Sequence, residues 1–171
     1  MQQAYARAAQ LRQPVAGMIA IWFDALLEVR LGNAERVAAL ADEMQALVDR
    51  HAIAQGQIAW QWFRGWADAR MGQPREGHRR IREAHEKNVE LGMLAGGSEN
   101  LGYAAEAFVL AGDWDAAEAA LLDVAAYGDA SGLVVMLVGS LTPGFERLAD
   151  AIVHSAPRWN EAGKFVRMVL T

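Results

Sequence analysis

The chain has 171 residues, of which 53% are hydrophobic and 22% are charged, and its formal net charge at pH 7 is −5. This length and composition are typical of one folded domain or a short repeat array, and an acidic chain is a poor general binder of nucleic acid. There is no cysteine, which excludes a disulfide framework and a thiolate metal site and fits a cytoplasmic protein.

Targeting signals are not evident in the sequence. Residues 1–12 lack the apolar core of a signal peptide. The longest apolar run, residues 133–138, is too short to cross a bilayer. We therefore expect a cytoplasmic protein that has no membrane partner.

The first predicted element is a short helix over residues 2–11. It ends at Gln13-Pro14, because the residue before a proline avoids the helical conformation. Since it has no partner upstream, we assign residues 1–13 to an orphan helix of a preceding repeat or to an N-terminal cap. Helices over residues 15–31 and 34–51 follow, with apolar residues three and four apart and Gly32-Asn33 between them.

The central stretch predicts a further helix pair, over residues 57–71 and 74–91. Gly72 suits the end of one helix, and Pro74 suits the first turn of the next. The first helix is apolar around so much of its circumference that it must lie between neighbours. Gly77 and Ala84 are small where two helices should cross closely.

A third pair is expected over residues 98–111 and 114–127, separated by Gly112. The pattern weakens beyond it, because valines and Gly139 lower the helix propensity of residues 133–141, for which a strand is the alternative. Amphipathic helices follow over 145–154 and 159–170. We assign residues 131–171 to an irregular C-terminal helical cap.

Gly32, Gly72 and Gly112 are forty residues apart, and small residues recur at the same spacing at Ala25, Gly65 and Ala105. A fixed period of this length, with one helix pair per period, is typical of an α-solenoid. We therefore predict an all-α chain of three antiparallel helix pairs with flanking helices. The pairs are residues 14–53, 54–93 and 94–130.

These small positions, together with Gly77 and Ala117, resemble tetratricopeptide (TPR) repeats, although their usual period is roughly 34 residues. The stretches Arg64-Gly65-Trp66-Ala67, Met71-Gly72 and Arg75-Glu76-Gly77 resemble the repeats of bacterial cyclase-linked and LuxR-type signalling ATPase regulators. The resemblance implies a role in assembly, effector sensing or partner docking. The ATPase, cyclase and DNA-binding elements of that family are absent from this chain.

Motifs for catalysis are missing or incomplete. The sequence has no glycine-rich phosphate loop and no nucleophile elbow, and Val89 stands where a zinc-protease motif starting at His85-Glu86 needs its second histidine. His78 and His85 could share a surface metal site, but no third ligand is placed beside them. Glu99 and Glu106 share a helical face without a nucleophile. We therefore predict no enzymatic activity, no cofactor and no metal.

The basic residues between Arg75 and Lys87 alternate with glutamates and lack aromatic neighbours, so we interpret them as a solvated face that does not bind nucleic acid. A different set is expected on the first helices, facing an inner groove that takes a protein or peptide. For Trp62 and Trp66, packing between repeats is the equal alternative. The predicted groove residues are Trp22, Arg30, Trp62, Trp66, Arg70, Glu99, Tyr103 and Glu106.

We thus predict a non-catalytic scaffold for protein–protein interaction, a repeat module of a bacterial signalling or transcriptional regulator. One alternative is a small-molecule effector sensor, because a groove rimmed by tryptophans could hold an apolar ligand. The other is a homo-oligomerisation module, such as a homodimer. It is suggested by the orphan first helix and by a basic repeat, residues 64–87, beside an acidic one, residues 88–146.

Overall fold

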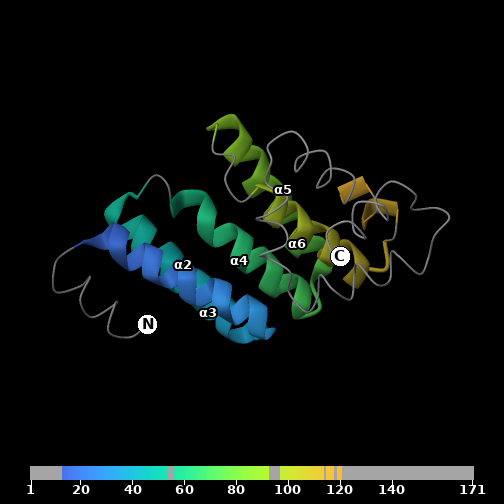
Figure 1. Ribbon diagram of the computed structural model, residues 1–171, viewed down its shortest axis with the longest axis horizontal. Coiled ribbons are helices and arrows are strands. Elements are labelled where there is room, and N and C mark those ends of the chain that lie inside the picture. Colours follow the sequence, from blue (N-terminus) through green and yellow to red (C-terminus); the bar gives the residue numbers. More distant parts are fainter. Residues whose placement is uncertain (1–12, 54–55, 93–96, 114, 118, 121–171) are drawn as a thin grey trace, which may run out of the picture.

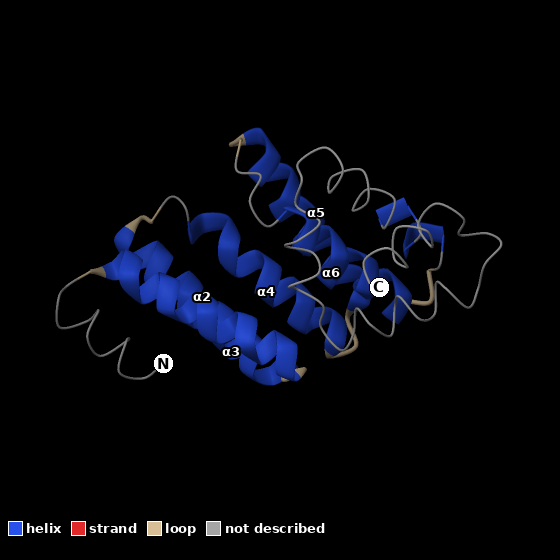
Figure 2. Ribbon diagram, in the orientation of Figure 1, coloured by secondary structure: helices blue, strands red, loops and turns tan. Residues whose placement is uncertain are grey.

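The computed structural model describes residues 13–53, 56–92, 97–113, 115–117 and 119–120, and all regular structure among them is α-helical. The helices with complete bounds are α2 (Pro14–Leu31), α3 (Ala34–His51), α4 (Gly56–Arg70), α5 (Pro74–Glu90) and α6 (Gly97–Leu110) (Figures 1 and 2). The prediction of an all-α chain is confirmed for this part. The N-terminal helix expected in residues 1–13 and the cap expected in 131–171 lie outside it, except for Gln13.

Each helix packs against its neighbours in the sequence, and the main contacts that skip one helix join α2 to α4 and α4 to α6. Figure 1 shows the helices succeeding one another along the long axis of the molecule, from α2 and α3 through α4 to α5 and α6. The first helices of successive pairs are therefore neighbours, which places residues forty apart in the sequence on adjoining helices.

Three turns share one geometry. Gly32, Gly72 and Gly112 have φ angles of 74°, 91° and 73°, a left-handed conformation that glycine adopts without steric cost. Each glycine N–H donates to the carbonyl three residues earlier, and the following N–H donates to the carbonyl five residues before it. This paired bonding ends a helix by satisfying its last carbonyls. The glycines predicted to end helices thus do so in one and the same way.

The main core lies between α2, α3 and α4. Val37, Leu40 and Met44 of α3 are fully buried there, against Ala25 of α2 and Phe63 of α4. The apolar residues of α3 recur three and four apart, so one stripe of this helix supplies the core. The opposite face of α3 remains polar.

Helices α4 and α5 meet backbone to backbone. A Cβ atom on Gly65 would lie 2.7 Å from the carbonyl oxygen of Gly77, and one on Gly77 would overlap the carbonyl oxygen of Gly65 and lie 2.8 Å from the backbone nitrogen of Ala69. No side chain fits in either direction. The expected close crossing at Gly77 is confirmed, and Gly65 is its partner.

Charged side chains connect α3, α4 and α5 beside this crossing. Asp68 is 3% exposed. Its Oδ1 accepts from Arg64 Nε at 2.9 Å, and its Oδ2 lies 3.3 Å from Arg80 Nε. Arg64 also donates to Asp42 of α3 at 2.7 Å. The buried carboxylate of Asp68 is therefore balanced by two guanidinium groups, as a charge inside a protein must be.

The first helix pair also has a charged contact between its two helices. Asp24 of α2 lies 3.4 Å from Arg36 of α3. Forty residues later, Arg64 stands in place of Asp24 and Glu76 in place of Arg36. Arg80 approaches both Asp68 and Glu76 and so links this second site to α4. Equivalent positions of the two pairs thus carry opposite charges.

We expect Gly77→Ala to destabilise the protein, although alanine favours a helix interior over glycine. The new methyl group meets backbone atoms of α4 that cannot move aside, so α4 and α5 must separate. The expected net loss is about 2 kcal/mol or more of unfolding free energy, measured by urea denaturation followed by circular dichroism.

Gly72→Ala is the matched control, because nothing lies within 4 Å of a Cβ there and only the positive φ is strained. It should cost roughly 1 kcal/mol. A smaller loss for Gly77→Ala than for this control would contradict the backbone contact.

Candidate interaction site

The structure buries half of the predicted groove residues. Trp62, Trp66, Tyr103 and Glu106 are 6%, 2%, 6% and 4% exposed. All four side chains are therefore packed between helices, which was the alternative prediction for Trp62 and Trp66. A groove floor made of these side chains is not open to a partner.

Trp22 is half-buried and contributes to the same packing. Its ring meets the rings of Trp62 and Phe63 edge to face, with centroids 5.5 Å apart in both cases. Such perpendicular contacts suit the charge distribution of aromatic rings. Trp22 thus joins α2 to α4, and little of it remains for a partner.

The remaining predicted groove residues differ in position. Arg30 is exposed near the end of α2, while the Arg70 side chain is 20% exposed near the end of α4. The Glu99 side chain lies outside the part of the molecule that the structure describes. Among the predicted groove residues whose side chains the structure describes, Arg30 and Arg70 are therefore the polar ones that reach the surface.

Trp66, Arg70 and Glu106 form one cluster between α4 and α6. Trp66 Nε1 donates to Glu106 Oε2 at 3.0 Å, and Arg70 Nη1 donates to Glu106 Oε1 at 2.9 Å. The Arg70 guanidinium carbon also lies 5.5 Å from the centre of the Trp66 ring, within the range of a cation–π contact. Both carboxylate oxygens have donors, so this buried charge is compensated, and the Arg70 side chain is held in place.

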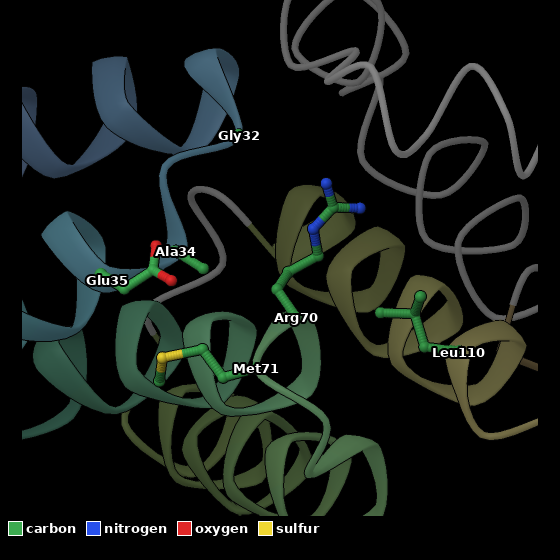
Figure 3. A pocket seen from close by; sticks show the side chains of 6 residues that line it. All are labelled: Gly32, Ala34, Glu35, Arg70, Met71 and Leu110. Carbon is green, nitrogen blue, oxygen red and sulfur yellow. The ribbon is translucent and has the colours of Figure 1, made fainter.

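The fixed guanidinium borders a surface hollow of about 620 Å³. Figure 3 shows it where α2 and α4 end and α3 begins, with α6 alongside, and the Arg70 side chain extends between the Gly32 turn and Leu110. Arg70 Nη2 lies 3.8 Å from the place of a Cβ on Gly32. The hollow is lined by Gly32, Ala34, Glu35, Arg70, Met71 and Leu110.

The lining suits binding more than catalysis. Met71 and Leu110 are 39% and 46% exposed, so they offer apolar surface on either side of Arg70. Glu35 adds one carboxylate. No serine, threonine, cysteine, histidine or lysine is among the six lining residues, so the hollow brings no nucleophile or proton-transfer pair together. It can offer a charge-assisted hydrogen bond and apolar contact.

The groove predicted from the sequence did not include Met71, Leu110 or Glu35. The positions of two of them in the sequence could have indicated that they are exposed. Met71 directly precedes Gly72, and Leu110 stands two residues before Gly112. Large apolar residues at the end of a helix, next to an exposed turn, are often left uncovered. Arg70 is the predicted residue that belongs to this hollow.

The two histidines of α5 take separate roles. His78 stacks on Phe108 of α6 with ring centroids 3.6 Å apart, and burial, followed by the charge of Arg82, lowers the pKa of His78 to about 4. His85 is 9% exposed. Among the described residues, no three histidine, aspartate or glutamate side chains are grouped as metal ligands.

In the described part of the chain, no helix is both long enough and apolar enough to cross a bilayer. Comparisons with protein-family models, curated proteins and solved structures give no match to this chain.

We expect Glu106→Ala to cost about 3 kcal/mol or more of unfolding free energy, because it leaves Arg70 and the Trp66 N–H without their buried acceptor. Adding Arg70→Met should recover part of that loss, since the charge is then removed as well. Urea denaturation of both single variants and the double variant gives the coupling energy between the two side chains.

Glu83→Ala is the matched control, because it removes an exposed carboxylate that bonds Arg79 at 2.6 Å. Exposed ion pairs contribute less than about 1 kcal/mol. Equal losses at Glu83 and Glu106 would contradict a structural role for the cluster.

His78 should make stability depend on pH. Its pKa is about 4 in the folded chain and 6.5 in an unfolded one, so the unfolded state gains a proton first as the pH falls. The stabilising contribution is complete above pH 6.5 and is lost as the pH falls towards 4. We therefore expect a smaller fall in melting temperature from about pH 7.5 to about pH 5.5 for His78→Phe than for the native chain. Parallel curves would show that His78 does not titrate in this way.

Proposed function

We propose that the chain is a non-catalytic protein-interaction scaffold made of TPR-like helix pairs, stacked as an α-solenoid with a period of about forty residues. Three structural features support this interpretation. They are the shared geometry of the Gly32, Gly72 and Gly112 turns, the backbone contact between Gly65 and Gly77, and the contact of each first helix with the next. The resemblance to the repeats of bacterial signalling ATPase regulators suggests a module of such a regulator, acting in the cytoplasm.

The proposed binding site is the hollow beside Arg70. The observation that carries it is a guanidinium fixed by Glu106 and Trp66 between two exposed apolar side chains, Met71 and Leu110. Arginine and large apolar residues are the usual anchors of protein interfaces. Because Arg70 is already held in place, little side-chain entropy is lost when a partner binds.

The chemistry of the hollow defines the kind of partner. Arg70 suits a carboxylate, and Met71 and Leu110 suit a large apolar side chain. Glu35 on the opposite side disfavours a second acidic group next to the first. We therefore propose a protein or peptide segment in which one acidic residue stands close to one or two large apolar residues.

This proposal can be tested with a displayed peptide library selected against the full chain. We expect enriched peptides to combine one acidic residue with apolar residues. Met71→Glu with Leu110→Glu should weaken their binding at least about tenfold, as measured by fluorescence anisotropy. Both positions are exposed, so folding should be preserved.

Val89→Glu is the matched control, because Val89 is a similarly exposed apolar residue, at 48%, that does not line the hollow. Its affinity for the selected peptides should remain unchanged. Peptides that bind equally well to all three proteins would show that the hollow is not the binding site.

A small-molecule effector is the second candidate for the same hollow, favoured by a volume within the range of ligand sites. The polar lining and the open position at the helix ends favour a peptide over a small apolar ligand. Competition between small acids and a selected peptide would distinguish the two.

A further inference from the structure

Helix α2 carries a continuous apolar surface that other described residues leave uncovered. Its members stand four residues apart along the whole helix, and none is charged. Nine large apolar residues are exposed in the described part of the chain, and five of them belong to this stripe. We call them the α2 stripe: Val15, Ile19, Phe23, Leu27 and Leu31, which are 47%, 46%, 58%, 48% and 68% exposed.

In the next helix pair, the equivalent surface of α4 is buried against other helices. Forty residues after Ile19, Phe23 and Leu27 stand Ala59, Phe63 and Ala67 of α4, which are at most 2% exposed. These residues belong to the core that α4 shares with α2 and α3. The α2 stripe therefore continues the type of face that packs against another helix one pair later.

Two residues of the stripe are larger than their equivalents on α4. Ile19 and Leu27 stand where α4 has Ala59 and Ala67. Alanines allow the close approach seen at α4, whereas long aliphatic side chains project and interlock with a facing row of the same kind. The shape of the α2 stripe thus fits a second helix with large apolar residues at the same spacing.

We propose that the occupant is a second copy of this chain, and that the α2 stripe is the interface of a symmetric dimer. The stripe is its own complement when two α2 helices lie antiparallel. With Phe23 on the two-fold axis, Val15 faces Leu31 of the second copy and Ile19 faces Leu27. A two-fold interface requires this kind of self-matching surface.

The spacing also defines how the helices cross. Rows of residues four apart interdigitate at a crossing angle of about −50°, so contact is densest at Phe23 and its two neighbours and thins towards both ends. Five half-exposed side chains offer roughly 400 Å² per copy. With flanking residues such as Leu26, the total area of both copies approaches the lower limit of specific interfaces, about 1,200 Å².

We expect a reversible dimer with a dissociation constant on the order of 10 µM, because the interface lies at the small end of specific interfaces. Because the stripe is uncharged, added salt should not weaken it. The dimer goes beyond the proposed function, since the Arg70 hollow shares no residue with the α2 stripe. Peptide binding and dimerisation are therefore measured independently, and either can fail alone.

Sedimentation velocity of the full chain, from about 1 to about 200 µM, tests the dimer. We expect the native chain to move from monomer to dimer in this range, at low and at high salt. Phe23→Glu should stay monomeric with an unchanged circular-dichroism spectrum, because it places two carboxylates on the axis. Val89→Glu, at an apolar site of α5 that is 48% exposed against 58% for Phe23, should dimerise like the native chain.

Single cysteines give a second test, because the native chain has none. On the two-fold axis, facing Cα atoms of closely packed helices fall within the roughly 7 Å that a disulfide spans. Phe23→Cys should therefore oxidise to a covalent dimer at least about tenfold faster than Val89→Cys.

Three outcomes would overturn the proposal. One is a native chain that stays monomeric over the whole concentration range, together with a Phe23→Cys thiol that reacts rapidly with a labelling reagent. This result would show that the α2 stripe is exposed to solvent and does not dimerise. Another is the same monomer with a slowly reacting thiol, which would show that the chain covers its own stripe. The third is a dimer that Phe23→Glu leaves intact, which would place the interface elsewhere.

Discussion

The contact between Gly65 and Gly77 sets the distance between α4 and α5, and much of the structure depends on that distance. With no Cβ on either side, the two backbones touch, and Ile81 and Ala84 are buried against α4 and its neighbours. The same approach brings Arg80 to the buried carboxylate of Asp68. A wider crossing would leave this carboxylate with fewer partners, so the packing and the charge balance rest on one pair of glycines.

The cluster of Trp66, Arg70 and Glu106 connects the buried core to the surface. It joins α4 to α6, first helices of successive pairs, through one carboxylate with a donor on each oxygen. An arginine on an open surface samples many rotamers, whereas Arg70 is held by the buried side chains of Glu106 and Trp66. A structural bond between helices thus prepares a cationic group for binding, at the point where the helix ends leave a hollow.

The sequence predicted the features that depend on local chemistry. A glycine that ends a helix needs only its own conformational freedom, so Gly32, Gly72 and Gly112 were identified correctly, as was the small residue Gly77. Burial was harder to predict. Helix α4 is apolar on most sides, so its pattern does not say whether Trp62 and Trp66 face a groove or a neighbour, and the burial of Glu106 depends on donors from a helix about forty residues away. The hollow arises where residues of α3, α4 and α6 and the turn at Gly32 come together, which no single periodicity encodes.

The opposite charges at the equivalent positions 24 of α2 and 64 of α4 have a consequence for a chain built from similar helix pairs. Repetition creates a hazard, because a helix can dock in the place of its counterpart. If α2 took the place of α4, Asp24 would meet Asp42 of α3, which Arg64 contacts in the native fold, and if α4 took the place of α2, Arg64 would meet Arg36. Both wrong pairings bring like charges together, so the sign of these four side chains helps each helix to choose its own partner during folding.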